Sequence, residues 1–169
     1  DGVIVQDLGV AELCRRHFPR LALHASTQMA VHNGAGVAVL RGLGFRRVIL
    51  ARELTLEQIG ALRDEYPDIE LEVFIHGALC YSFSGLCFAS WDLTGRSGNR
   101  GECAQICRSR FRIDDAARPA NLPAEGHLFS CRDLAADSLV LELARIGVDA
   151  LKIEGRMKSP EYVATTVAL

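Results

Sequence analysis

The sequence lacks the features that mark membrane, secreted or strongly nucleic-acid-binding proteins. No apolar run approaches the roughly 18 residues that a membrane-spanning helix needs, and no signal-peptide pattern opens the chain. The formal net charge of -2 gives no general nucleic-acid footprint. Of the 169 residues, 49% are hydrophobic, which is enough for one well-buried core. We therefore expect a soluble globular protein of the cytoplasm.

Several catalytic signatures are also missing. No Gly-rich phosphate fingerprint follows a predicted strand, which disfavours a nucleotide-binding Rossmann-like sheet. Ser26, Ser82 and Ser84 are present, but neither a G-x-S-x-G elbow nor an H-E-x-x-H pair occurs. A thiol-imidazole pair of Cys80 and His76 is the remaining route to proteolysis. Cys80 is better explained as a metal ligand, for the reason given next.

Six cysteines are too few for a disulfide scaffold, and in a reducing compartment clustered cysteines more often bind metal or do redox chemistry. Cys14 lies on the apolar face of a predicted helix and is expected to be a core residue. The others follow one strand and form a group: Cys80, Cys87, Cys103, Cys107 and Cys131. Their spacing differs from the C-x2-C-x2-C ferredoxin pattern. An iron-sulfur cluster, a structural zinc ion and unligated thiols are all open on spacing alone.

The rest of the chain predicts alternating strands and helices. Apolar runs, capping signals and Gly or Pro stops place strands at 2–6, 21–24, 47–51, 70–75 and 150–153, and helices at 8–17, 35–43, 55–66, from 131 or 133 to 145, and from 159 onward. Thr55 and Gln58 have capping-box spacing. The last helix is expected to continue to Leu169. The cysteine-bearing stretch at about 77–126 is expected to be an insertion without regular structure.

Strands that alternate with helices are parallel and joined by crossovers. We therefore predict an α/β fold of the parallel (β/α) barrel type, present as a partial barrel of about five βα units. A closed barrel typically needs about 250 residues. The chain has no initiator Met, so residues 1–169 are expected to be a fragment that lacks roughly three N-terminal units. Exposed sheet edges then predict a homodimer or a local rearrangement, which light scattering would distinguish.

Polar side chains follow each predicted strand, where a barrel builds its site. His24 and His76 are candidate proton-transfer residues, with a buried structural histidine as the alternative. Arg52, next to Glu53, is a candidate clamp for a carboxylate or phosphate, and Gln28 offers a polar contact.

Three charged residues alternate along the last strand end. Lys152 and Glu154 are expected to project into the barrel and Arg156 to lie at its mouth, because alternate side chains share one face. They would act on an anionic substrate or form a structural ion-pair cluster. Five arginines make the cysteine segment locally basic, as an RNA-facing patch or a solvated surface: Arg96, Arg100, Arg108, Arg110 and Arg112.

Five stretches resemble the U32 peptidase family, also called the collagenase-like protease family. They are HASTQ at 24–28, VILAREL at 48–54, EVFIHGALCYSFSGLC at 72–87, GRSGNRGECAQICR at 95–108 and LKIEGRMKSPEYV at 151–163. They cover nearly the whole chain in the family's order. The wording of the stretch at 95–108 is most similar to the branch that hydroxylates a 23S rRNA cytidine.

The resemblance implies more than the residues alone. It implies oxygen-independent hydroxylation of an rRNA or tRNA base, with prephenate as the hydroxyl source. It also implies a [4Fe-4S] cluster on Cys80, Cys87, Cys103 and Cys131, with Cys107 as an alternate ligand. A collagenase-like peptidase and a non-catalytic metal-binding domain that docks RNA are the two alternatives.

Overall fold

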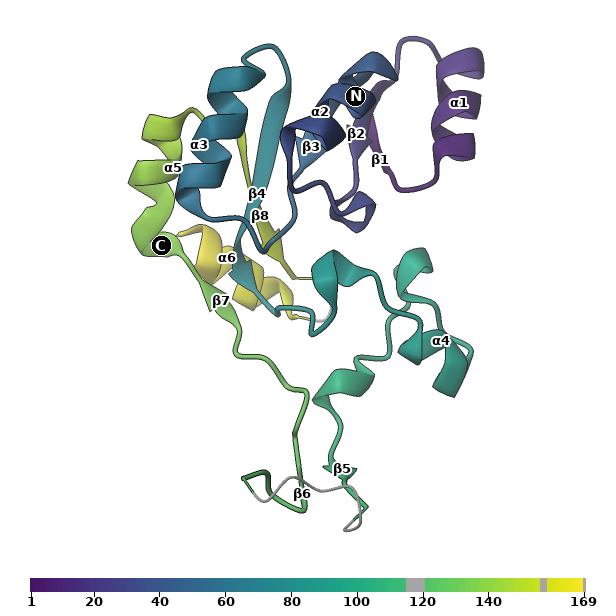
Figure 1. The fold of residues 1–169 in the computed structure, drawn as a ribbon, viewed down its shortest axis with the longest axis vertical. Helices are drawn as coiled ribbons and strands as arrows, with labels where there is room; N and C mark the ends of the chain where they lie inside the picture. The colour runs from purple at the N-terminus through teal and green to yellow at the C-terminus, as the bar shows by residue number, and fades with distance from the viewer. Residues whose placement is uncertain (115–120, 156–157, 169) are drawn as a thin grey trace.

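The computed structural model describes residues 1–114, 121–155 and 158–168, which form an α/β protein on one curled sheet (Figure 1). Five strands are parallel, in the order β1-β2-β3-β4-β8, and a short strand, β7, pairs antiparallel with the end of β4. These strands are β1 (Gly2–Val5), β2 (Ala22–Ala25), β3 (Phe45–Ile49), β4 (Glu70–Gly77), β7 (Leu134–Ala135) and β8 (Ala150–Glu154). The predicted partial (β/α) barrel of about five units is confirmed.

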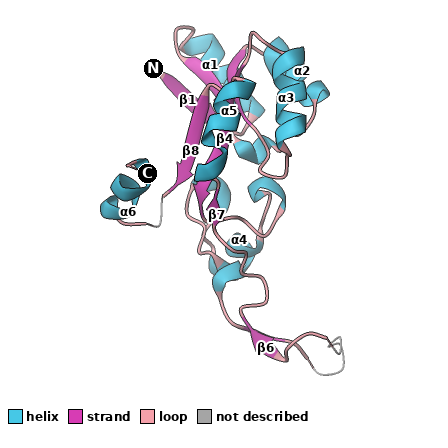
Figure 2. Ribbon diagram, turned by 90° about the vertical axis from the view of Figure 1, so that its left-hand side faces the viewer, coloured by secondary structure: helices cyan, strands magenta, loops and turns pink. Residues whose placement is uncertain are grey.

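A helix separates or follows each parallel strand: α1 (Leu8–His17), α2 (Gly34–Gly42), α3 (Leu56–Glu65), α5 (Val140–Ile146) and α6 (Pro160–Val167). In α1, α2 and α6 the first turn is capped by a side chain that accepts an orphan backbone amide, from Asp7, Asn33 and Ser159 respectively. The predicted capping box is present: Gln58 N donates to Thr55 Oγ1 at 3.3 Å and Thr55 N donates to Gln58 Oε1 at 2.9 Å. In Figure 2, α6 lies apart from the other helices, beyond β8.

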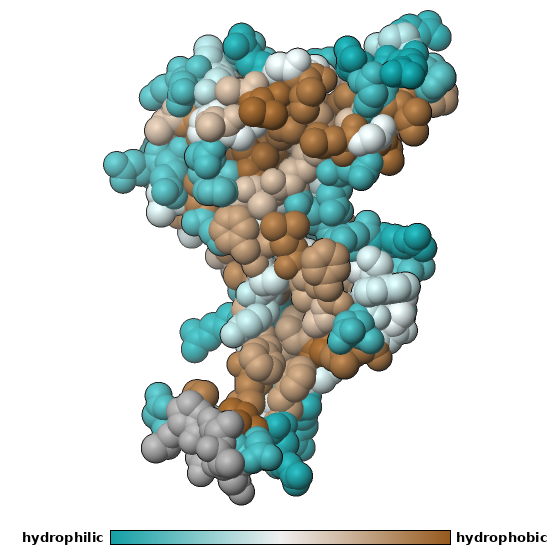
Figure 3. All heavy atoms as spheres, turned by 45° about the vertical axis from the view of Figure 1, so that its right-hand side comes forward, coloured by the Kyte–Doolittle hydropathy of each residue, from teal (hydrophilic) through white to brown (hydrophobic). Residues whose placement is uncertain are grey.

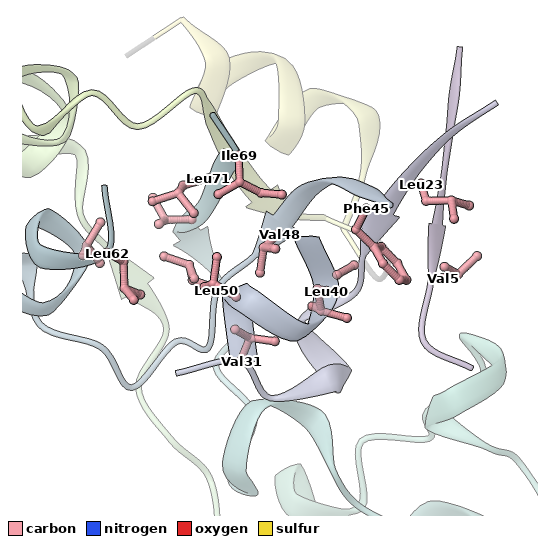
Figure 4. Close-up of a cluster of buried hydrophobic side chains, with 14 of the residues drawn as sticks. Val5, Leu23, Val31, Leu40, Phe45, Val48, Leu50, Leu62, Ile69 and Leu71 are labelled. Carbon is pink, nitrogen blue, oxygen red and sulfur yellow. The ribbon is translucent and has the colours of Figure 1, made fainter. Parts of the chain in front are cut away.

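The hydrophobic core lies between the sheet and helices α1, α2, α3 and α5. Alternate strand residues face these helices, and Leu71 and Val48 are fully buried there (Figure 4). Helix residues such as Leu40 and Leu62 complete the layer. Because successive strand side chains point to opposite faces, one sheet face is apolar throughout and the other is free to carry charge. The sheet and these four helices are called the half-barrel below.

The opposite face of the sheet is charged. His24, Arg47, Glu72 and Lys152 lie on it, from four adjacent strands. This is the interior face of a barrel, and the predicted inward direction of Lys152 agrees with its ion pair to Glu72 at 3.0 Å.

The described residues between 78 and 133, called the β4–β7 segment below, extend away from the half-barrel (Figure 1). The expectation that this stretch lacks regular structure is wrong in part. It contains α4 (Ala89–Thr94), 3-10 helices at Phe83–Gly85, Gly98–Arg100 and Ile106–Arg108, and a hairpin of β5 (Phe111–Arg112) and β6 (Glu125–Gly126). Thr94 Oγ1 donates to the Ser90 carbonyl oxygen at 2.6 Å, and Gly95 ends α4 with a φ of 71°. Such local hydrogen bonds are not visible as hydrophobic periodicity.

Other boundaries also differ from expectation. The helix predicted from 131 or 133 begins only at Val140, because residues 134–136 pair with β4, where Ala136 N donates to the Ile75 carbonyl oxygen at 2.9 Å. A 3-10 helix at Asp137–Leu139 precedes it, and Gly147 ends it as predicted. Strand β3 starts and ends two residues earlier than expected, at Phe45 and Ile49. Helix α6 ends at Val167, and Leu169, to which the helix was expected to continue, lies outside the described residues.

Among the helices formed by the described residues, none has both the length and the apolar character that crossing a membrane requires.

Candidate functional site

A cavity of about 670 Å³ lies at the carboxyl ends of the parallel strands. Its inner wall comes from the ends of β2, β3, β4 and β8, including Gln28, Arg52, Phe74 and Lys152. Its outer wall comes from the β4–β7 segment. Figure 3 shows apolar side chains running in a band from the half-barrel, across the narrow middle of the molecule, toward the projecting hairpin. The position is that of ligand sites in (β/α) barrels.

The loop after β3 fixes the first turn of the β4–β7 segment. Glu53 accepts two hydrogen bonds from Ser84, from the backbone N at 2.8 Å and from Oγ at 2.6 Å. Ser84 is 1% exposed and holds a φ of 43°, which costs a non-glycine residue free energy. Arg52 Nη1 also donates to the Ala78 carbonyl oxygen at 3.1 Å. These bonds set the direction in which Cys80 and Cys87 leave the sheet.

Gln28 fixes a second point. Its Nε2 donates to Asn99 Oδ1 at 3.1 Å and to the Gly98 carbonyl oxygen at 3.4 Å. Gln28, predicted as a substrate contact, therefore lines the cavity, but its side-chain amide nitrogen already donates to other residues of the protein. The sequence did not identify Glu53 as an anchor of the segment. A carboxylate that follows a strand carries no local pattern that would indicate a hydrogen-bond partner 31 residues away.

Arg108 ties the far side of the segment together. Its guanidinium donates to the Leu79 carbonyl oxygen at 3.0 Å, to Ser130 Oγ at 2.9 Å and to Asp133 Oδ1 at 3.2 Å, and it also contacts the Cys131 carbonyl oxygen. Arg108 was one of five arginines predicted as an RNA-facing patch or a solvated surface. In the structure it is an internal cross-link, because one planar guanidinium can serve several acceptors at once.

Four cysteines line the cavity: Cys80, Cys87, Cys103 and Cys107. Their thiols are free and half-buried. Burial, and after it the neighbouring Cys80 thiol, raise the pKa of the Cys107 thiol. Cys131 is not among the lining residues, although its backbone is bound by Arg108. Cys14 packs against the half-barrel core, as expected.

The donor set suits a thiolate-held metal group, because four soft sulfur ligands line one cavity and Glu154 is the one carboxylate among the described residues that line it. Gathering of the ligands is incomplete. Within residues 1–114, 121–155 and 158–168, no three Cys, His, Asp or Glu side chains are arranged to hold one ion. The identity of the cofactor stays a prediction. So does the assignment of Cys107 or Cys131 as the fourth ligand.

Two cations lie at the inner wall of the cavity. The Arg52 guanidinium carbon is 3.9 Å from the centroid of the Phe74 ring, and Lys152 Nζ is 5.5 Å from it. The ring holds the guanidinium by a cation–π contact. Glu154 lines the same wall. The predicted pair Lys152 and Glu154 is therefore brought to the cavity with Arg52, and Arg156 lies outside the described residues.

The two histidines predicted for proton transfer lie elsewhere. His24 is on the charged sheet face, where burial, followed by the charge of Arg47, lowers its pKa. His76 packs against the Tyr162 ring, with ring centroids 5.7 Å apart. Neither is among the residues that line the cavity. Their catalytic role stays a prediction without support from position.

The charged sheet face is a network of ion pairs. Arg47 contacts Glu70 at 2.7 Å and Glu72 at 3.1 Å, and Lys152 contacts the other oxygen of Glu72. Hydrogen bonds from Arg47 and then Arg46 lower the pKa of Glu70. Glu72 is buried, so removing both of its partners would leave an uncompensated charge, and removing one would leave the other to pair with it. Lys152 thus takes part in an ion-pair cluster, the structural alternative predicted for it, and its role toward an anionic substrate stays a prediction.

Comparison with known proteins identifies the family of this chain. The profile of peptidase family U32 matches residues 1–169, so the chain belongs to that family. It is similar to the solved structure of the U32 peptidase Mk0906, with a TM-score of 0.54 over 92% of this chain and 55% of the other, at 18% identity. That likeness concerns the fold.

Curated relatives carry two kinds of name. The 23S rRNA 5-hydroxycytidine C2501 synthase of Escherichia coli K12 is 42% identical over 99% of this chain, and the tRNA hydroxylation protein P1 of Bacillus subtilis 168 is 40% identical over 99%. A collagenase of Porphyromonas gingivalis W83 is 34% identical over 85%. The chain spans 25%, 41% and 37% of these relatives' lengths.

Proposed function

We propose that this chain belongs to an enzyme for oxygen-independent hydroxylation of an RNA base, such as a cytidine of 23S rRNA. The observation that carries the proposal is the cavity at the strand ends, where four thiols face Arg52 and Lys152 across one space. The relatives named for rRNA and tRNA hydroxylation support the RNA substrate. The thiols support a redox group, since a hydroxylation without oxygen still removes electrons from the base.

The redox group we propose is a [4Fe-4S] cluster. Cys80, Cys87 and Cys103 would hold it, with Cys131 or Cys107 as the fourth ligand. A cluster held in this way supplies electron transfer beside the substrate. Zinc is the alternative, because it also accepts four thiolates.

Anaerobic purification followed by iron, labile-sulfide and zinc assays separates the two metals. We expect iron and sulfide, and stoichiometric zinc without sulfide would contradict the cluster. Cys107→Ser and Cys131→Ser then identify the fourth ligand, because the variant that loses sulfide has lost a ligand. Cys14→Ser is the matched control, since Cys14 packs against the core and lies outside the cavity lining.

A small carboxylate such as prephenate is the proposed hydroxyl source. Arg52 and Lys152 would bind its carboxylates, since a guanidinium presents paired donors that match a carboxylate. Calorimetric titration with prephenate tests this step. Arg52→Lys keeps the charge but loses the paired geometry, so we expect clearly weaker binding, together with a small fall in the melting temperature from the lost bond to the Ala78 carbonyl oxygen.

The whole proposal is tested by mass spectrometry of rRNA and tRNA nucleosides from a strain that lacks the gene. Loss of one hydroxylated nucleoside, restored by the wild-type gene, supports it. Unchanged nucleosides together with lost gelatinase activity would support the second candidate, a collagenase-like peptidase, which the similarity to the Porphyromonas gingivalis collagenase favours. RNA binding without any nucleoside change would leave the third candidate, a metal-binding domain that docks RNA.

A further inference from the structure

The outer part of the cavity is lined by three aromatic rings from separate parts of the β4–β7 segment. Tyr81 follows β4, Phe111 belongs to β5 and Phe129 follows β6. The Tyr81 and Phe129 centroids are 5.1 Å apart at an interplanar angle of 80°, and those of Phe111 and Phe129 are 4.8 Å apart at 89°. The β5–β6 hairpin turns the chain back, so that residues 48 positions apart meet as one cluster.

These rings are not core residues. Tyr81 is 59% exposed and Phe129 is 37% exposed, and none of the three belongs to the buried cluster of the half-barrel. Edge-to-face packing fixes the rings against one another while leaving ring surface open to the cavity. Exposed aromatic surface of this kind, at the mouth of a cavity, is typical of a ligand site.

The sequence that carries Tyr81 and Phe111 is rich in arginine. Residues 77–114 contain five arginines and three acidic residues, although the chain as a whole carries a net charge of -2. Arg110 and Arg112 flank Phe111 in the sequence, Arg110 just before β5 and Arg112 on it, and both are exposed. Arg110 pairs with Glu125 at 2.9 Å, but both side chains are more than half exposed, so that pair is weak and readily exchanged for a phosphate. Arginines beside aromatic rings are the combination that binds single-stranded nucleic acid.

The volume of the cavity fits a single planar group. Its volume of about 670 Å³ lies within the range of about 300–1,000 Å³ that holds small ligands. Enzymes that modify a base bring it out of its stack and into a pocket, because the reacting atom is otherwise covered. Cys80 and Cys107 line the same cavity as Tyr81 and Phe129, so a group that packs on these rings lies in the space that the thiols also border.

We propose that Tyr81, Phe111 and Phe129 form the stacking face for one unpaired RNA base, and that Arg110 and Arg112 contact the phosphates beside it. This inference rests on the proposed RNA hydroxylation. The residues that would receive the substrate base are different from the cavity cysteines and from Arg52 and Lys152. The base enters from the hairpin side and stacks on the rings. Its reacting edge then faces the thiol-lined inner part of the cavity.

Fluorescence anisotropy with the full-length protein and two labelled single-stranded RNA oligonucleotides tests the stacking face. One oligonucleotide has an ordinary central cytidine and the other an abasic site at that position. Stacking of one base on an aromatic side chain is worth about 1–3 kcal/mol by alanine substitution, so Tyr81→Ala and Phe129→Ala are each expected to weaken binding of the first oligonucleotide by about 5- to 150-fold. Neither should weaken the abasic one further. Phe129→Leu, which stays apolar but loses the ring, should behave as Phe129→Ala does.

Phe88→Ala is the matched control, because Phe88 is 69% exposed in the same segment and lies outside the cavity lining. It should bind like the wild type. Arg110→Ala should weaken both oligonucleotides equally and reduce the salt dependence of binding by about one phosphate contact.

Three results would overturn the inference. One is full affinity of Tyr81→Ala and Phe129→Ala for the cytidine oligonucleotide. Another is equal weakening of both oligonucleotides by these variants. The third is that a gelatin peptide displaces the RNA from the wild type, and that this displacement is lost when the same rings are replaced. The first two leave the proposed RNA hydroxylation intact if the deletion strain still loses a nucleoside. No RNA binding by the wild type together with unchanged nucleosides would overturn both.

Discussion

The half-barrel and the β4–β7 segment are stabilised by different interactions. In the half-barrel, the buried side chains are almost all apolar, and strand and helix residues pack in one continuous cluster. In the described residues between 78 and 133, the buried side chains are Ser84 and Ser90, both polar. Large apolar side chains of the segment, such as Phe88 and Trp91, are instead exposed.

The difference makes the half-barrel a rigid support and the β4–β7 segment an adaptable one. Burial of apolar area is non-directional and gives the half-barrel its global stability. The segment depends on directional bonds. Glu53 accepts from Ser84, and Arg108 donates to Leu79 and to the stretch at 130–133. Ser90 Oγ donates to the Arg96 carbonyl oxygen and accepts from Ala104 N. Regions with few buried apolar contacts open locally at low free-energy cost. A segment that must admit a ligand and gather thiols benefits from that property.

The largest effect is expected at the junction of the two regions. Gly77 has a φ of 107°, and an added Cβ would lie 2.3 Å from the Glu154 carbonyl oxygen of the neighbouring strand. Gly77→Ala therefore combines backbone strain with a backbone clash and should lower the free energy of unfolding by about 3 kcal/mol or more in urea titrations. Gly60→Ala in α3, with no atom within 4 Å of the added Cβ, should leave it unchanged or raise it by about 0.5–1 kcal/mol. Equal midpoints for both variants would contradict the close approach of β4 and β8.

A pair of leucine truncations compares the two regions directly. Leu71 is fully buried in the half-barrel, whereas Leu93 is 64% exposed in α4. Leu71→Ala should cost about 2–5 kcal/mol in urea unfolding, because it removes transfer free energy and leaves a cavity. Leu93→Ala should stay within about 0.5 kcal/mol of the wild type. A large cost at Leu93 would mean that α4 is buried against something in solution.

Removing one anchor should loosen the segment alone. Glu53→Gln replaces the charged acceptor of two Ser84 hydrogen bonds, which are worth about 1.5–3 kcal/mol each when one partner is ionised. We expect faster hydrogen exchange at residues 83–87 and little change in the urea midpoint of the half-barrel. Glu57→Gln, at an exposed position in the first turn of α3, is the control and should change neither. A midpoint that falls as far as in Leu71→Ala would show that both regions unfold together.

The smallest effect concerns pH and the charged sheet face. The pKa of His24 is lowered from its ordinary value of 6.5, mainly by burial and then by Arg47, so the unfolded chain binds the proton more readily. Stability is therefore complete above about pH 6.5 and is lost as pH falls through the lower folded value. Glu70, whose pKa is also lowered, adds a second loss of the same sign below about pH 4.5.

The urea midpoint measured from about pH 7 to about pH 4 should therefore fall in the wild type. In His24→Asn the slope between about pH 6.5 and pH 5 should be smaller, and in Glu70→Gln the slope below about pH 4.5 should be smaller. His17→Asn, at the end of α1, should keep the wild-type profile. An unchanged slope in His24→Asn would contradict a contribution of His24 to the pH dependence of stability.

The site was predictable only in part from local sequence. The strand-end position of Arg52, Lys152 and the cysteines follows from alternating strands and helices, since a parallel sheet brings its carboxyl ends together. The aromatic cluster of Tyr81, Phe111 and Phe129 was not predicted. Three rings scattered over a polar segment have neither helical nor strand periodicity, so no local pattern assigns them a shared surface.

The sequence by itself determined the regular elements and the family. The half-barrel strands and α1, α2, α3 and α6 start within a few residues of their predicted positions, because caps, stops and hydrophobic periods act over short stretches. Only the tertiary structure decided the use of the side chains between them. It put Cys107 rather than Cys131 on the cavity wall, turned Gln28 and Arg108 inward as anchors, and used residues 134–136 for sheet pairing instead of a helix. These outcomes depend on partners tens of residues away, and the free energy of such contacts exists only once the chain has folded.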